Sequence, residues 1–391
     1  MANKNTPAPA VDYAYVNQQQ RAAVLAMAIN QELQILATRY TPPNTGALGQ
    51  TINVPLRNVG LVTKFTVLVR AKVRGVAGEV HTLQPFGPAN FFSNVTLTDL
   101  QNQTRINTTG WHLHYVASAR DAAVFGGAYQ NDSPTMLGNN NLVIAAPATM
   151  TGTAQRDLYM AYEIPVAYSD RDLRGAIYAN VLNATWNLSL TVNPNMFVAS
   201  TANGVGAVYK SSSAVLGVLD YWDIEVYQHF KEQLPVDSRN GQIILPVLDL
   251  GVMYRLENTV MTGLVANQEL SQGFGNNRQF LSTFAVYDNS GVLNPGTDVN
   301  YFAMQTANTT LLFKRTPHML ALQHRKRLGD DFPPGVYYFD HRERPVETAQ
   351  YGNVQLSVSL ASATSANSVI LLGYEYFAEL GMVMNAGAIA N

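Results

Sequence analysis

The stretch VPLRNVG at residues 54–60 has a counterpart in LPVLDLG at residues 245–251, with apolar, proline and glycine positions in the same order. Further matched pairs follow in order: 92–99 with 281–288, 166–170 with 336–340, and 178–181 with 351–354. The offset shrinks along the chain from 191 residues (54 to 245) to 170 (166 to 336). Two copies of one fold would give this pattern if the second had lost about twenty residues of loop. The sequence therefore predicts an internal duplication, with its junction near residues 228–236.

The matched stretches lie among many segments with the character of β-strands. Residues 62–73 are rich in Val, Phe, Thr and Leu. Within residues 184–192, Trp186, Leu188 and Leu190 alternate with polar residues, as on a half-buried strand. Clusters of Gly, Pro and Asn separate these segments, which favours sandwiches or barrels over alternating strands and helices. We therefore predict an all-β chain.

Length and composition point to two domains and to assembly. The 391 residues exceed the roughly 250–300 at which one hydrophobic core usually stops growing. Charged residues make up 13%, against about 25% in an average soluble protein. So few charges leave neutral surface for contact with partners. The net charge of −2 argues against a body that wraps nucleic acid, and we expect no direct sequence-specific nucleic-acid binding.

The N-terminal region predicts one long helix after a polar arm. Between residues 17 and 40, apolar residues recur at helical spacing, and the proline-rich stretch TPPNTG at residues 41–46 ends the pattern. The residues of interest are Arg21, Leu25, Ile29, Leu33, Leu36 and Arg39. This helix could lie on a membrane surface, or it could pack against its own or a neighbouring subunit. With no signal peptide and no apolar run near the roughly 18 residues that cross a bilayer, we expect a soluble, intracellular product.

Two shorter helices are expected within loops. Ser169 or Asp170 could cap a helix over residues 172–179, and Pro317 could open another that ends near Leu328. The second contains His324 and the basic residues Arg325, Lys326 and Arg327. Because Asp330 and Asp331 partly cancel this charge, the cluster is typical of a subunit contact rather than of a nucleic-acid site.

No set of residues predicts catalysis or metal binding. In WHLHY at residues 111–115, a strand would place His112 and His114 on one face, as in cupin metal sites. The carboxylate and third histidine of a cupin are missing at the required spacing, and cysteine is absent from the chain. Nucleotide-binding and hydrolase motifs are also missing. We therefore expect no enzyme activity, no catalytic residue, no metal and no cofactor.

Several blocks resemble the major coat proteins of tectiviruses, the membrane-containing icosahedral bacteriophages. They are FGPAN (86–90), TGWHLHY (109–115), QLPV (233–236), ILP (244–246), YRLEN (254–258), DFPPGVYY (331–338), QYGNV (350–354) and GYEYF (373–377). The blocks occur in order from about residue 50 to the C-terminus, whereas the N-terminal arm and residues 199–213 diverge.

The resemblance implies a double jelly roll, two eight-stranded rolls side by side with an N-terminal helix and short loop helices. We expect an arm and helix at residues 1–48, rolls at 49–232 and 233–380, and a tail at 381–391. Three such chains would form a pseudo-hexagonal homotrimer within an icosahedral shell around an internal membrane and double-stranded DNA. The helix and terminal arms would then lie on the inner side.

The implied partners are other copies of the chain, both within the trimer and in neighbouring trimers, vertex and minor membrane proteins, and the viral membrane surface. The implied location is the virion capsid, after synthesis in the host cytoplasm. A tandem carbohydrate-binding jelly roll is the alternative. Its modest support is the loop at residues 126–131, where Tyr129 stands among small and polar residues.

Overall fold

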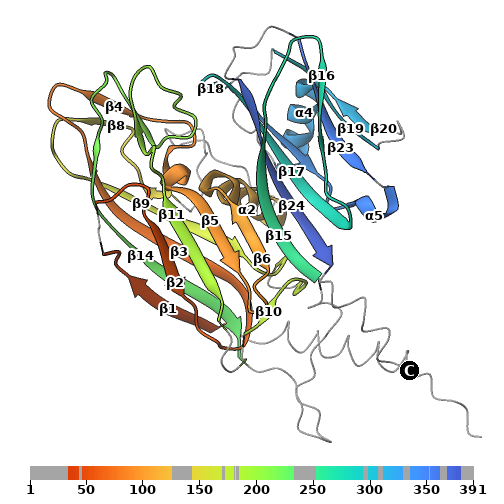
Figure 1. Ribbon diagram of the computed structural model, residues 1–391, viewed down its shortest axis with the longest axis horizontal. Coiled ribbons are helices and arrows are strands. Elements are labelled where there is room, and N and C mark those ends of the chain that lie inside the picture. The colour runs from red at the N-terminus through yellow and green to blue at the C-terminus, as the bar shows by residue number, and fades with distance from the viewer. Residues whose placement is uncertain are drawn as a thin grey trace, which may run out of the picture.

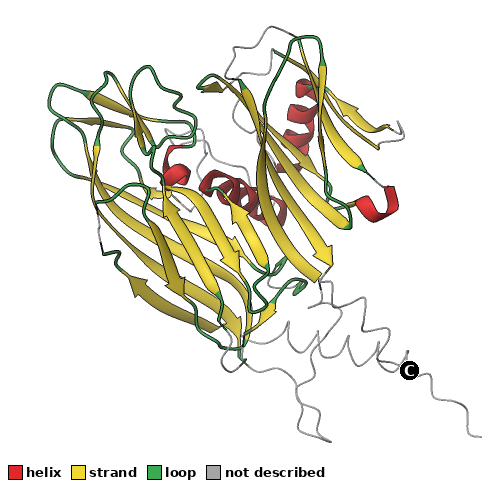
Figure 2. Ribbon diagram, in the orientation of Figure 1, coloured by secondary structure: helices red, strands yellow, loops and turns green. Residues whose placement is uncertain are grey.

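The computed structural model describes residues 34–43, 46–125, 143–169, 172–179, 181, 185–232, 252–293, 298–306, 311–328, 335–351, 353–361 and 368–379. Strands dominate this part of the chain, and a few helices lie between and beside the sheets (Figure 2). The strands form two sandwiches, which we call roll 1 (residues 34–231) and roll 2 (residues 252–379).

Roll 1 is an eight-stranded jelly roll made of two sheets. The first sheet has the order β1 (Gln34–Tyr40), β14 (Val218–Lys231), β3 (Leu61–Arg74), β9 (Arg156–Pro165). The second has the order β2 (Thr51–Pro55), β11 (Asn187–Val192), β5 (Phe92–Thr98), β6 (Thr104–Thr108). Along β3 every second residue from Phe65 to Val73 is buried, as expected for a strand with one face on the core.

Roll 2 repeats this arrangement strand for strand. Its first sheet contains β15 (Val252–Met261), β24 (Val369–Glu379), β17 (Arg278–Asn289) and β21 (Val336–Asp340). Its second has the order β16 (Glu269–Gly273), β23 (Val354–Leu360), β19 (Val299–Thr306), β20 (Leu311–Arg315). The eight strands of each roll can be numbered along the chain. In both rolls the order of neighbouring strands is first, eighth, third, sixth in one sheet, and second, seventh, fourth, fifth in the other. The all-β fold with a duplicated jelly roll is therefore confirmed.

A helix follows the fifth strand of each roll. These helices are α2 (Gly110–Phe125) after β6 and α4 (Pro317–Leu328) after β20, and α4 confirms the helix predicted there. The remaining helices are η1 (Gly87–Phe91) and α5 (Thr348–Tyr351). The shorter strands are β4 (Val80–Leu83), β7 (Val143–Ala145), β8 (Thr149–Thr151), β10 (Ile177–Tyr178), β12 (Phe197–Val198), β13 (Tyr209–Ser211), β18 (Val292–Leu293) and β22 (Val346–Glu347).

The rolls stand side by side and share a sheet (Figure 1). Strand β6 of roll 1 pairs in parallel with β15 of roll 2, with Leu256 opposite Ile106 and Glu257 opposite Asn107. This pairing joins the second sheet of roll 1 to the first sheet of roll 2 in a single ten-stranded sheet. Backbone hydrogen bonds therefore connect the two rolls directly.

The predicted helix at residues 17–40 is wrong at its C-terminal end. Residues Gln34–Tyr40 form β1, which pairs with β14 along its whole length. Roll 1 therefore includes residues of the predicted N-terminal arm (1–48), and it does not begin at residue 49. Strand β1 lies at a sheet edge and is partly exposed along its length, so it has few apolar residues. Their spacing fits a helix as well as a strand, which explains the wrong prediction. Residues 1–33 lie outside the described residues.

Other local predictions also fail. Residues 111–115 are helical, and residues 172–179 contain turns and β10 instead of a helix. The first two pairs of the predicted repeat are out of register by one strand. The first pairs the end of β2 with residues before β15, although β2 corresponds to β16. The second pairs β5 with β17, although β5 corresponds to β19. Residues 233–251, which precede β15, and the loop at 126–142 lie outside the described residues. The predicted junction at 228–236 begins within β14, which ends at Lys231. The last two pairs are closer to register. Residues 166–169 directly follow the sixth strand, β9, while 336–340 form the sixth strand, β21, and Tyr178 and Tyr351 both lie between the sixth and seventh strands.

Candidate functional site: the interface between the two rolls

Helix α2 fills the space between the rolls. It packs on β5 and β9 of its own roll, and its residues 110–119 are all buried. The Tyr115 ring stacks on Phe284 of β17 with 5.8 Å between centroids, and Phe284 stacks on Tyr338 of β21 at 4.5 Å. Such contacts add to the energy of burying the rings. Residues 110–119 have no exposed side because both sides of the helix face protein.

A glycine lets α2 approach roll 2 closely. A Cβ atom at Gly373 of β24 would lie 2.4 Å from Cδ2 of His112, nearer than any real contact allows. His112 Nδ1 lies 2.7 Å from the Thr108 hydroxyl, and its Nε2 has no hydrogen-bond partner among the described residues. Burial lowers the pKa of His112 to about 3, so the ring is neutral at ordinary pH.

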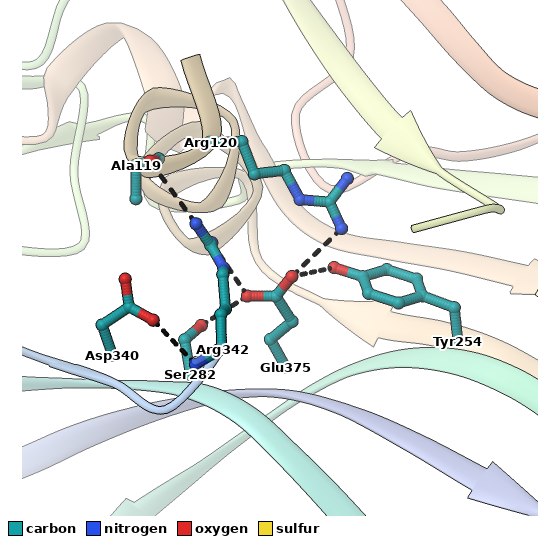
Figure 3. Close-up of polar contacts among 7 residues, drawn as sticks. All are labelled: Ala119, Arg120, Tyr254, Ser282, Asp340, Arg342 and Glu375. Carbon is teal, nitrogen blue, oxygen red and sulfur yellow. Dashed lines mark hydrogen bonds and ion pairs between the residues drawn. The ribbon is translucent and has the colours of Figure 1, made fainter. Parts of the chain in front are cut away.

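The centre of the interface is a buried ionic cluster, which we call the Glu375 cluster (Figure 3). One oxygen of Glu375 accepts hydrogen bonds from Arg120 of α2 at 3.1 Å and from the Tyr254 hydroxyl at 2.9 Å. The other accepts them from Ser282 at 2.5 Å and from Arg342 at 3.1 Å. Arg120 comes from roll 1, and the other members come from roll 2.

The cluster keeps its carboxylate charged although no water reaches it. Burial raises the pKa of Glu375, but the charges of Arg342 and Arg120 outweigh burial and hold that pKa well below its usual range. Burial raises the pKa of Tyr254 well above its ordinary value, so its hydroxyl remains a donor. A buried pair of this kind is costly to break, since removing one partner leaves an uncompensated charge.

Contacts extend along the interface on both sides of this cluster. Asn203 of roll 1 donates a hydrogen bond to Asp288 of β17 at 2.7 Å. The guanidinium of Arg174 lies 4.6 Å from the ring centroid of Phe377 in β24. The first sheet of roll 2 is consequently buried on both faces. Its Phe284 and Phe377 belong to the core of roll 1, while Phe280 and Tyr376 belong to that of roll 2.

The residues predicted as a membrane- or partner-facing helix are not brought together in the described chain. Arg21, Leu25, Ile29 and Leu33 lie outside the described residues. Leu36 lies on β1, not on a helix. Arg39 also lies on β1, where its Nε donates to Asp223 of β14 at 2.9 Å.

The predicted basic cluster lies on α4. Arg325 and Lys326 are exposed there, and Arg327 is the next residue of the helix. His324 is buried and donates from Nε2 to the Tyr338 carbonyl at 2.8 Å. The histidine thus fixes α4 to β21, while the side of α4 that carries Arg325 and Lys326 faces outward.

The metal alternative gains no support from the geometry. His112 and His114 lie on helix α2, so the strand face on which that alternative rested is wrong. Within the described ranges, no three His, Cys, Asp or Glu side chains are grouped to hold a metal. Among the described helices, none is long and apolar enough to cross a membrane.

Sequence reasoning missed the residues that join the rolls, namely Arg120, Gly373, Glu375 and Arg342. One signal was present, since Glu375 stands in the middle of the strand VILLGYEYFAE at residues 369–379, between apolar and aromatic residues. A charge in such a strand must be paired when it is buried. Its partners could not be identified, because they come from four distant segments.

Comparison with known proteins identifies the family. Models described as the N-terminal and C-terminal parts of the P3 major capsid protein match residues 10–234 and 251–391. The chain belongs to the P3 major capsid protein family. It is 39% identical over 396 residues to the major capsid protein P3 of Enterobacteria phage PRD1, and the match covers 100% of both chains. Membership in a capsid protein family confirms the expected structural role, and it leaves the enzyme and carbohydrate-binding alternatives unsupported.

Solved structures of other viral capsid proteins have the same fold. The crystal structure of the STIV major capsid protein has a TM-score of 0.63 and 10% identity, covering 90% of this chain and 99% of that one. A chain of the PBCV-1 virus capsid has a TM-score of 0.52 and 11% identity, covering 88% and 94%. At such low identity, these matches show only that the chain has the same fold as these capsid proteins.

Proposed function

We propose that this protein is the main building block of an icosahedral virion shell. Three copies would form a homotrimer whose six rolls give a pseudo-hexagonal outline, around an internal membrane and double-stranded DNA. The observation that carries this proposal is the first sheet of roll 2, which is buried on both faces and joins the two rolls through a shared sheet and a shared core. A shell needs subunits whose shape does not vary between positions.

The proposed threefold assembly follows from the duplication. Two rolls of the same topology stand side by side, so three chains supply six similar units, which can close a ring. The low charged fraction of 13% favours extensive burial between chains. We expect the trimer to bury well over the roughly 2,000 Å² at which obligate interfaces begin.

The N-terminal segment is proposed to face the shell interior. Gln34 at the start of β1 lies opposite Phe230 near the end of β14, and Val252 lies opposite Glu379. Each roll therefore begins and ends at the same end of its sandwich. Residues 17–33, with Arg21, would follow from that end towards anionic lipid headgroups, each charge contributing about 1 kcal/mol. Vertex and minor membrane proteins would be further partners, and synthesis would take place in the host cytoplasm.

Two truncations test the interior role. Deleting residues 1–33 should leave the trimer intact and weaken its binding to anionic vesicles in a co-flotation assay. Deleting residues 1–40 should also destabilise roll 1, because it removes β1 and exposes the edge of β14. Unchanged vesicle binding after the shorter deletion would overturn the membrane contact. Trimer formation itself is read by native mass spectrometry, where a monomer would overturn the assembly proposal.

A further inference from the structure

Helices α2 and α4 differ in what covers them. Residues 110–119 of α2 are buried on all sides, whereas α4 buries Leu320 and His324 against its own roll. On its other side α4 exposes two large apolar residues, Met319 at 48% and Leu322 at 49%. Lys326 continues this exposed stripe one turn further. An exposed apolar stripe of this kind indicates a contact surface for a partner.

The two helices occupy corresponding places in the duplicated fold. Helix α2 starts two residues after Thr108, the last residue of β6, and α4 starts two residues after Arg315, the last residue of β20. Each packs on the fourth and sixth strands of its own roll, β5 and β9 for α2, β19 and β21 for α4. Counted from these starts, Met319 stands at the position of His112 and Leu322 at the position of Tyr115.

Those two positions of α2 are the ones that hold the next roll. His112 lies against Gly373, and Tyr115 stacks on Phe284. If the rolls continued in a series, the exposed apolar residues of α4 would therefore contact the roll that comes after roll 2. The described residues form two rolls, so we look for this next roll in a second copy of the chain.

A matching sheet face is available on roll 1. The first sheet of roll 2 turns one face towards α2, and the corresponding face of roll 1 lies on β1, β14, β3 and β9. The outward residues of β14 include Tyr221, Glu225 and Tyr227, which are partly exposed. Tyrosine is enriched at protein interfaces because it combines apolar area with a polar tip.

The charges on this face form ion pairs within it, among them Arg70 with Glu225 and Arg74 with Asp220. Glu225 lies opposite Leu68 of β3, in the middle of β14, as Glu375 lies opposite Ser282 in the middle of β24. Glu225 pairs with Arg70 in its own roll, yet its side chain stays 22% exposed. In α2 the residue that reaches Glu375 is Arg120, and the same position of α4 is occupied by Arg327. The end of α4 that carries exposed Lys326 would thus lie near Glu225, as the end of α2 lies near Glu375.

We propose that α4 of one copy packs on the β1–β14–β3–β9 sheet of a second copy, repeating between chains the contact that α2 makes within one chain. Three such contacts close a ring of six rolls, because the interface joins unlike faces of identical chains. This inference rests on the proposed trimer and assigns the surfaces that form it.

A charge on α4 tests the contact. Leu322→Glu should convert the trimer to monomers at micromolar concentration in native mass spectrometry. Val292→Glu is the matched control, since Val292 of β18 is 67% exposed and lies away from α4, and it should remain trimeric. Circular dichroism melting checks that both variants fold.

Cross-linking provides a second readout that does not depend on breaking the trimer. The chain has no cysteine, so Leu322→Cys with Leu68→Cys adds the only thiols. A short bismaleimide should then link copies into covalent dimers and trimers. The pair Leu322→Cys with Val260→Cys, which places the second thiol on exposed Val260 of β15, should give no such ladder.

The outcomes separate this inference from the proposed function. A wild-type trimer that survives Leu322→Glu, or that gives no ladder with Leu322→Cys and Leu68→Cys, overturns the assigned surfaces and leaves the shell function standing. A monomeric wild-type protein overturns both. Loss of the trimer with Leu322→Glu alone, together with the ladder, supports the contact between α4 and the sheet.

Discussion

Replacing Glu375 by glutamine should weaken the junction between the rolls more than any surface charge change. Glu375 has no exposed surface, and the side chains of Arg342 and Arg120 are 8% and 20% exposed. Removing one partner of a buried ion pair typically costs about 3–5 kcal/mol, because the remaining charge is left uncompensated. Glu375→Gln leaves two arginines without their carboxylate. We therefore expect a loss of about 3–5 kcal/mol in the free energy of unfolding.

The matched control is Glu163→Gln on β9. Glu163 pairs with Lys64 at 3.2 Å, but the two side chains are 30% and 27% exposed, and such pairs contribute about 0–1 kcal/mol. The assay is guanidinium unfolding followed by circular dichroism and by tryptophan fluorescence. All three tryptophans lie in roll 1, so fluorescence follows that roll while circular dichroism follows both. Equal losses in the two variants would refute the structural role of the Glu375 cluster.

Further predictions concern the same interface. Gly373→Ala should lower the free energy of unfolding by about 1–3 kcal/mol, since its Cβ would overlap the His112 ring, whereas Gly206→Ala, where nothing lies within 4 Å, should be near neutral in the same assay. The His112 pKa is lowered to about 3 by burial, against about 6.5 when unfolded, so the unfolded state binds the extra proton and stability should fall as pH drops from 6.5 to 3. Urea midpoints measured across that range should change less in His112→Gln, and an equal slope would contradict the assignment.

The sequence predicted the strand content and the duplication, but not the correct alignment of the two copies. Short apolar strands resemble one another, so residues 92–99 were matched to 281–288, although β5 corresponds to β19 and not to β17. Strand order within a sheet depends on long-range pairing, which local patterns do not encode. The same limit hid β1, whose seven residues pair on one side only.

The interface was harder to predict than the fold. Residues 110–119 of helix α2 are buried on every side, so WHLHY shows no amphipathic stripe and its pattern predicts a strand. The Glu375 cluster unites residues from α2, β15, β17 and the turn after β21, segments far apart along the chain. By contrast, α4 was predicted correctly because Pro317 marks its first turn and only one of its sides is buried.

Electron microscopy of the purified full-length chain under assembly conditions tests the central claim most directly. The proposal predicts trimers of three 42.7 kDa chains with a pseudo-hexagonal outline, and closed icosahedral shells built from them. Particles from the source should show the same units on their surface. Uniform single chains with two lobes, with neither trimers nor shells at any concentration, would contradict it.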